Sequence, residues 1–311
     1  MSKSFFVIIA SMSLVAAVCR AQSPWRLNAG VATNAWIVSH AGQPLLRYVF
    51  NPRQNKPYVA EFSAPGGRNI LRDAPWDHLH HHGLMYAMVV NGLNFWEEVS
   101  GHGVERVIET TATESGSAVR LRQVIHWVAP QDAFLADTTP AALLVERRTL
   151  ILTVDTAARE SALEWKAEFE VGQKTNTVRL TGGTYHGLGL RFLQSLDALA
   201  QHSYAGRKPD LANSRQEVSI ARWASVSFAA PEDPATVVLA PRPTNTRGDG
   251  AFFSMLTPFA YLSATQRLDK EPLEYRRGDK FALRYLVLLY PEIKTTEAIE
   301  ARVQRWREPS P

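Results

Sequence analysis

Short runs of large apolar side chains, several of them alternating with polar ones, recur along most of the chain. Alternation with a period of two residues is typical of β-strands that bury one face in a core. The runs that predict strands are residues 35–40, 44–50, 57–63, 84–90, 93–96, 104–111, 118–127, 143–154, 163–171, 187–192, 223–228, 236–240 and 281–290. Asn91-Gly92 separates two of these runs, and both residues tolerate the positive φ of a tight hairpin turn. We therefore predict a central hairpin over residues 84–96.

Helical patterns are scarce. In residues 295–306, Ile299, Val303 and Trp306 recur at spacings of four and three, and Thr295 or Thr296 can cap the helix. Many strands at short spacing, with no glycine-rich nucleotide-binding loop, favour a sandwich over alternating βαβ units. The sequence thus predicts an all-β fold, a large antiparallel β-sandwich with a short C-terminal helix.

The first 21 residues have the pattern of a secretory signal peptide. Lys3 precedes an apolar run from Phe5 to Val18, and Ala21 offers a small residue for cleavage. An uncleaved anchor is the alternative, although a membrane span needs roughly 20 apolar residues. We predict that residues 1–21 are a signal peptide and that residues 22–311 form a single β-sandwich domain. The mature protein would be exported, periplasmic or secreted, without a membrane span.

Composition excludes several kinds of site. Cys19 is the only cysteine and lies in the predicted signal peptide, so the mature chain has no thiolate nucleophile, zinc knot or iron–sulfur cluster. The formal net charge is +4 at pH 7, with basic and acidic residues interspersed. Because no basic block or RNA-reading motif is present, nucleic acid is not an expected partner. We expect a small-molecule or glycan substrate.

Residues 72–96 hold the densest set of chemically active side chains. Four of the nine histidines fall within five positions, at His78, His80, His81 and His82. If this segment is extended, His78, His80 and His82 project to one face and His81 to the other.

One hypothesis for this cluster is a metal site. His78 and His80 would bind a divalent transition metal, and Asp77, Glu97 or Glu98 would supply a carboxylate. Without a thiolate, the site would offer only nitrogen and oxygen ligands, which suits zinc, iron, manganese or copper.

A second hypothesis is a site without metal. His78 or His81 would act as general acid or base near neutral pH, and Asp77 would orient the imidazole. The structural alternative is a polar turn that happens to be rich in histidine.

Two further stretches carry candidate residues. Residues 182–192 contain four glycines beside His186 and Arg191. Glycine within a strand often marks the close approach of a backbone or a ligand, so we expect His186 in catalysis and Arg191 in substrate binding. A glycine bulge with a surface arginine is the alternative.

The loop 241–247 offers Asn245 and Arg247, and arginine suits bidentate capture of oxygen pairs. We include both as substrate-binding candidates, against the alternative of a stiff solvated loop. Trp76 and Trp96 flank the histidines and could stack on the apolar face of a sugar, although aromatic residues are also ordinary core residues.

These motifs resemble a known family. Residues 72–84 (RDAPWDHLHHHGL) and 90–96 (VNGLNFW) resemble the signature of the PmoA-like family of exported bacterial proteins of unknown function. The resemblance extends along most of the mature chain, through residues 187–192, the loop 243–247 and the end at 278–290. Asp77, His78, His80 and His81 match the family pattern residue by residue. Leu79, His82 and Asn94 depart from it, where the family tends to have Pro, Arg and Asp.

The resemblance implies a large β-sandwich, similar to the galactose-mutarotase-like supersandwich, and an association with sugar catabolism. The methane oxygenase that the family label evokes is a polytopic membrane protein, whereas this mature chain has no apolar stretch of about 20 residues. We therefore expect an enzyme acting on a carbohydrate or related polyol, as a hydrolase, lyase or epimerase. The alternatives are a non-catalytic glycan-binding β-sandwich and a metal-dependent oxidoreductase.

Overall fold

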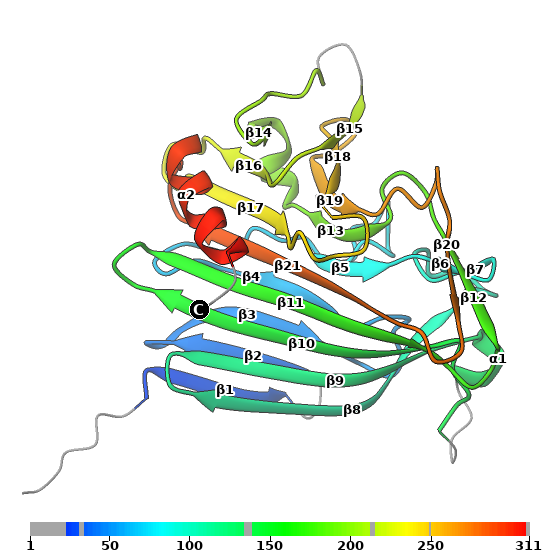
Figure 1. The fold of residues 1–311 in the computed structure, drawn as a ribbon. Coiled ribbons are helices and arrows are strands. Elements are labelled where there is room, and N and C mark those ends of the chain that lie inside the picture. Colours follow the sequence, from blue (N-terminus) through cyan, green and yellow to red (C-terminus); the bar gives the residue numbers. More distant parts are fainter. Residues whose placement is uncertain (1–22, 31–33, 134–138, 212–214, 249, 309–311) are drawn as a thin grey trace, which may run out of the picture.

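The computed structural model describes residues 23–30, 34–133, 139–211, 215–248 and 250–308. The prediction of an all-β sandwich is confirmed, because two large antiparallel sheets face each other and a small third sheet closes one end (Figure 1). The predicted signal peptide lies outside the described residues. No helix in the described ranges is long and apolar enough to cross a bilayer.

The first large sheet has nine strands, in the order β1-β2-β3-β4-β5-β13-β19-β18-β15. Its strands are β1 (Trp25–Gly30), β2 (Ala35–His40), β3 (Gln43–Val49), β4 (Tyr58–Phe62), β5 (Leu84–Ala87), β13 (Gly187–Arg191), β15 (Gln216–Ile220), β18 (Ala251–Met255) and β19 (Tyr261–Thr265).

The second large sheet has eight strands, in the order β14-β16-β17-β21-β11-β10-β9-β8. Its strands are β8 (Val104–Ser115), β9 (Ala118–Val128), β10 (Leu144–Asp155), β11 (Glu160–Val171), β14 (Ala200–Tyr204), β16 (Ala224–Phe228), β17 (Ala235–Pro241) and β21 (Lys280–Tyr290).

The small sheet has four strands, in the order β20-β12-β6-β7. They are β6 (Val89–Val90), β7 (Leu93–Asn94), β12 (Thr177–Thr181) and β20 (Leu273–Arg276). The remaining elements are α1 (Pro130–Ala133), the 3-10 helix η1 (Gln194–Leu199) and α2 (Thr296–Arg307).

The predicted central hairpin is present but shorter than expected. Asn91 and Gly92 have φ of 51° and 79°, and Val90 pairs with Leu93 across the turn. The predicted strand 84–90 divides at Met88, because β5 belongs to the nine-stranded sheet and β6 to the small one. The chain therefore leaves one sheet and enters another immediately before the hairpin.

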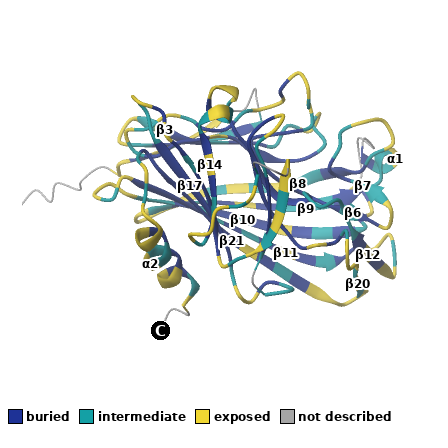
Figure 2. Cartoon of the chain, turned by 90° about the horizontal axis from the view of Figure 1, so that it is seen from above, coloured by how far each residue is buried: buried dark blue, intermediate teal, exposed yellow. Residues whose placement is uncertain are grey.

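Apolar side chains fill the space between the two large sheets, and Figure 2 shows their strands as mostly buried. The C-terminal helix covers the outer face of the eight-stranded sheet (Figure 1). Thr295 caps α2 by accepting a hydrogen bond from the Ala298 amide, and Ile299, Val303 and Trp306 are buried as the spacing predicts.

The outer face of the nine-stranded sheet carries a different set of side chains. Phe252 packs toward Tyr204 of the facing sheet, so strand alternation turns Phe253 and Met255 outward. Tyr261 is directly opposite Met255 in the register and joins them on that face. This outer face forms one wall of the candidate site.

Candidate functional site

A cavity of about 320 Å³ lies on this outer face. Cavities of this order accommodate small ligands. One part of its wall is polar and the other is apolar. The lining residues are His78, His80, His81, Glu97, Tyr185, Gln216, Phe253, Met255, Pro258, Phe259 and Tyr261.

The histidine segment forms a compact loop of two successive turns. The His78 amide donates to the Pro75 carbonyl and the His81 amide to the His78 carbonyl, both at 2.9 Å. The segment is therefore not extended, and the predicted division of its side chains between two faces is wrong. The ring of His81 lies 4.6 Å from that of His78 and 4.5 Å from that of His80, centroid to centroid. The turns bring all three imidazoles to one cavity.

His82 points away from this cavity into a buried polar network. Its Nδ1 lies 2.6 Å from Asp73 Oδ1, and its Nε2 lies 3.1 Å from Glu98 Oε1. Lys56 Nζ completes the network, 2.6 Å from Glu98 Oε1, and also donates to the Trp96 carbonyl. The network joins the start of the histidine loop to the segment that carries Glu97.

The electrostatics of this network favour its charged forms. Burial alone would lower the pKa of His82, but its hydrogen bonds to Asp73 and Glu98 raise that pKa above the ordinary value. Burial alone would raise the pKa of Glu98, but the His82 hydrogen bond and the charge of Lys56 lower it to about 2. The network holds an imidazolium and an ammonium against two carboxylates.

Glu97 is held at the cavity by neutral donors. The Asn94 side-chain amide donates to Oε2 of Glu97, and the Tyr185 hydroxyl lies 3.4 Å from Oε1 as a donor. Asn94 in turn accepts a hydrogen bond from the Trp96 amide at 2.7 Å. Burial and the nearby charge of Glu97 raise the pKa of Tyr185. These contacts fix the carboxylate beside the imidazoles.

The imidazoles of His80 and His81 are kept neutral by their surroundings. Burial lowers the pKa of His81 to about 2, and its Nδ1 has no hydrogen-bond partner in the described structure. Burial and the charge of Lys56 also lower the pKa of His80. The buried hydroxyl of Tyr261, another lining group, likewise has no partner among the described residues. Two buried polar atoms in the wall of the cavity thus have unmet hydrogen bonds.

His186 lies behind the cavity rather than in its lining. Its ring stacks on the Trp96 indole, with centroids 4.9 Å apart and planes 10° apart. A Cβ on Gly182 would lie 3.0 Å from His186 Nδ1, so this glycine allows the close packing of the ring. Burial lowers the pKa of His186 to about 4.

Arg191 packs against Phe259, which lines the cavity. Its guanidinium carbon lies 3.3 Å from the ring centroid of Phe259, and Nη2 lies 3.9 Å from Asp77 Oδ2. Burial lowers the pKa of Arg191 to about 10. Asp77 lies outside the cavity lining, with its Oδ2 3.2 Å from His78 Nδ1. Its pKa is lowered, against the effect of burial, by the His78 hydrogen bond and the charge of Arg191.

The two predicted sugar-stacking tryptophans lie outside the cavity lining. Trp76 is 83 % exposed at the tip of the histidine loop. Trp96 is 0 % exposed, so its indole has no surface to offer a ligand.

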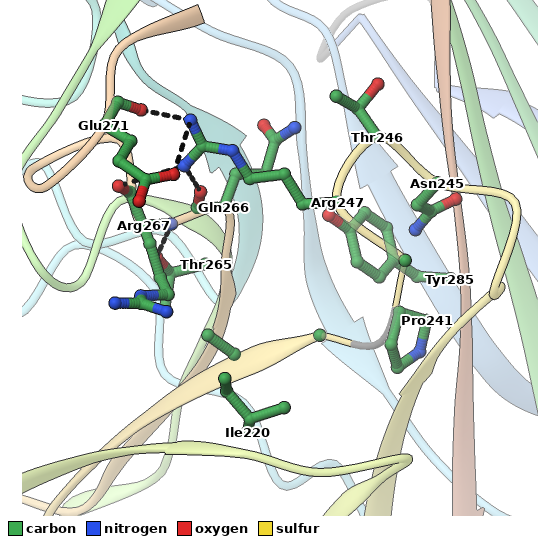
Figure 3. Close-up of a pocket in the computed structure, with 13 residues that line it drawn as sticks. Ile220, Pro241, Asn245, Thr246, Arg247, Thr265, Gln266, Arg267, Glu271 and Tyr285 are labelled. Carbon is green, nitrogen blue, oxygen red and sulfur yellow. Dashed lines mark hydrogen bonds and ion pairs between the residues drawn. The ribbon is translucent and has the colours of Figure 1, made fainter.

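Asn245 and Arg247 line a separate cavity of about 210 Å³ (Figure 3). Arg247 donates to the backbone carbonyls of Gln266, at 2.6 Å, and Glu271. The Asn245 side chain pairs with the backbone of Arg284, accepting at 2.7 Å and donating at 3.0 Å. Asn245 thus ties its loop to β21 and Arg247 ties it to the segment 266–271, and neither side chain lines the histidine cavity.

No three His, Cys, Asp or Glu side chains within the described ranges are arranged to hold a metal ion. The rings of His78 and His80, the predicted metal ligands, have centroids 5.8 Å apart and planes at 61°.

Several lining residues were not predicted from the sequence. Tyr185 precedes His186 in the glycine-rich stretch, and this position could have identified it as a candidate site residue. Phe253, Phe259 and Tyr261 come from a region with no predicted strand.

Comparison with solved structures shows the fold. The GH36 alpha-galactosidase AgaB from Geobacillus stearothermophilus matches with a TM-score of 0.51 and 11% identity, over 86% of this chain and 41% of that structure. The galactosidase domain of the alpha-galactosidase-sucrose kinase AgaSK matches with a TM-score of 0.54 and 9% identity, over 86% of this chain and 42% of that one. This chain therefore spans about two fifths of either structure.

No curated protein matches the sequence at a significant level. A family of unknown function, DUF6807, matches residues 35–304. This match covers most of the chain and includes every residue that lines the histidine cavity. The chain therefore belongs to the DUF6807 family, a family of unknown function.

Proposed function

We propose that the protein is an enzyme that binds a carbohydrate or related polyol in the histidine cavity and transfers a proton there. The observation that carries the proposal is the pair of buried polar groups with unmet hydrogen bonds, His81 Nδ1 and the Tyr261 hydroxyl, at a cavity that also holds His80 and Glu97. Buried polar groups are otherwise almost always paired. Both atoms are buried, so the two side chains would have to turn toward the cavity for hydroxyl groups of a bound polyol to satisfy them.

The two walls of the cavity suit a sugar. The apolar wall of Phe253, Phe259 and Tyr261 offers contact area for the apolar face of a sugar ring. The polar wall offers hydrogen bonds to its hydroxyls. The structural likeness to galactosidase domains supports a carbohydrate-related role at the level of the fold.

His80 is the proposed acid–base group. It is half-buried, and burial lowers its pKa, so the imidazole is neutral at pH 7 and free to accept a proton. Glu97 lies close enough to influence the charge on His80 and would stabilise the imidazolium that forms. His78, beside Asp77, is a second candidate for the same step.

A panel of sugars assayed for turnover tests the proposal, with His80→Gln as the variant. We expect turnover to fall by roughly 100-fold or more, the usual share of general acid–base catalysis, at nearly unchanged thermal stability. Leu79→Ala is the matched control, since Leu79 lies in the same loop and is 66% exposed. Full activity in His80→Gln would overturn the assigned role.

A non-catalytic glycan-binding protein is the second candidate, and the exposed Trp76 favours it. Sugar binding without turnover, and flat between about pH 5 and 8 across the histidine range, would support it.

Export is part of the proposal, supported by the pattern of residues 1–21. Sequencing the N-terminus of the mature protein should give Gln22 first. The motifs that resemble the PmoA-like family of exported proteins also support export. Membership of that family remains a prediction from these motifs.

A further inference from the structure

Among the described residues that line the histidine cavity, Glu97 is the only Asp, Glu, Lys or Arg side chain. We propose that this carboxylate selects ligands with a protonated amine, so that the substrates of the cavity are amino sugars or other amino-bearing polyols. The inference rests on the proposed function and names its substrate class.

The cations nearest to the cavity are already matched by other carboxylates. Lys56 and His82 contact Glu98, and His82 also contacts Asp73. These two cations and two anions balance each other. Arg191 is the next cation, and it is matched by Asp77, with 3.9 Å between Nη2 and Oδ2.

Glu97 itself receives only neutral hydrogen-bond donors, the Asn94 amide and the Tyr185 hydroxyl. Within the described ranges it forms no ion pair with a lysine or arginine. The imidazoles beside it are neutral, because burial disfavours the charged forms of His80 and His81. The cavity therefore holds one negative charge without a cationic partner.

A half-buried carboxylate gains most from a partner that brings both charge and hydrogen bonds. An ammonium group on the ligand supplies both. The aromatic wall adds to this preference, since aromatic rings such as those of Phe253 and Tyr261 also attract cations. A ligand carboxylate would instead meet Glu97 as a like charge in a low-dielectric site.

Calorimetric titration of the full-length mature protein with glucosamine, N-acetylglucosamine, glucose and glucuronate tests the inference. N-acetylglucosamine keeps the nitrogen but removes its charge. We expect glucosamine to bind roughly ten-fold or more tightly than N-acetylglucosamine, as for one charged hydrogen bond. Glucuronate should bind most weakly. The preference should decrease as sodium chloride is raised.

In the same buffer, Glu97→Gln should reduce the preference for glucosamine to about two-fold or less. Glu97→Asp keeps the charge and should retain a preference, which separates loss of charge from loss of folding. Glu109→Gln, an exposed change on β8, is the matched control and should keep the wild-type ratio.

Equal binding of all four sugars would overturn the inference and leave the proposed function standing. A preference that survives Glu97→Gln would also overturn it. If no sugar binds, including the galactose-series counterparts of the four, the proposed function fails and the inference fails with it.

Discussion

His82 Nδ1 lies 2.6 Å from Asp73 Oδ1, and this contact ties the end of the histidine loop to its beginning. Tyr58 reinforces it, because its ring stacks on His82 with centroids 4.0 Å apart and its hydroxyl donates to Asp73. The loop that carries His78, His80 and His81 is thereby closed by a side chain that never reaches the cavity.

Replacing His82 should destabilise the protein. His82→Gln removes the cation that faces Asp73 and Glu98, and breaking a buried pair in this way costs roughly 3 kcal/mol. We take the low end of the range because the Asp73 side chain is 34% exposed. Urea unfolding at pH 6 measures the loss. The difference from the wild type should shrink as pH rises through the raised pKa of His82, since stability from a raised pKa is lost in that direction. His40→Gln, in a strand remote from the network, is the control and should cost about 1 kcal/mol or less.

His202 should make stability depend on acid pH. Burial lowers its pKa to about 4 in the folded protein, against roughly 6.5 in the unfolded chain. Between these values the unfolded state binds one more proton, so the free energy of unfolding rises with pH by up to about 1.4 kcal/mol per pH unit. His202→Gln should reduce the slope by that amount. Urea unfolding from pH 5 to 6.5 measures it, and an unchanged slope would contradict the assignment.

Gly189 should tolerate no side chain. A Cβ there would collide with the Tyr261 hydroxyl and lie 3.2 Å from the Trp96 ring. Gly189→Ala should cost about 1–3 kcal/mol through overpacking, and should weaken ligand binding by displacing Tyr261 from the cavity wall. Thermal unfolding and sugar titration measure the two effects. Adding Tyr261→Phe should recover part of the stability, because it removes the nearest atom; no recovery would point to another cause.

Arg247 should prove structural rather than substrate-binding. Arg247→Ala removes charged hydrogen bonds to backbone carbonyls of the 266–271 segment, at a cost of roughly 1.5–3 kcal/mol. Sugar affinity at the histidine cavity should stay within two-fold by the same titration, which is within about 0.4 kcal/mol. A large loss of affinity at unchanged stability would restore its predicted role in binding.

Local patterns identified the elements whose burial alternates or repeats regularly. The strand predicted at 118–127 ends one residue before β9 does, and the helix predicted at 295–306 differs from α2 by one residue at each end. In both elements one face is buried and the other is not, so the period is visible in the sequence.

The apolar wall of the cavity was invisible for the opposite reason. All five residues of β19, Tyr261–Thr265, are buried, and four of five in β18. A strand covered on both faces shows no alternation, and Ser254 and Ser263 interrupt the kind of apolar run by which the equally buried β17 was predicted. The cavity's apolar half therefore could not be predicted, although its histidine half could.

Three of the four clustered histidines line one cavity, but the shape of their loop was not predicted from the sequence. The faces of an extended strand follow from spacing alone, whereas two turns closed by His82 and Asp73 depend on distant partners such as Lys56. The contacts of the loop at 245–247 depend on the fold in the same way, because Arg247 pairs with carbonyls that only the fold brings near.

The charged half of the site comes from one short stretch of chain, residues 73–98, and most of the apolar half from another, residues 253–261. The polar groups of the cavity and most of the apolar groups that shape it therefore lie in separate segments of the chain. Substitutions in the second segment would change which ligand fits while the first keeps its histidines and Glu97. A library confined to residues 253–261 would therefore sample new ligand preferences without altering the charged network. Such a division would let relatives of this protein diversify in specificity while the charged network stays unchanged.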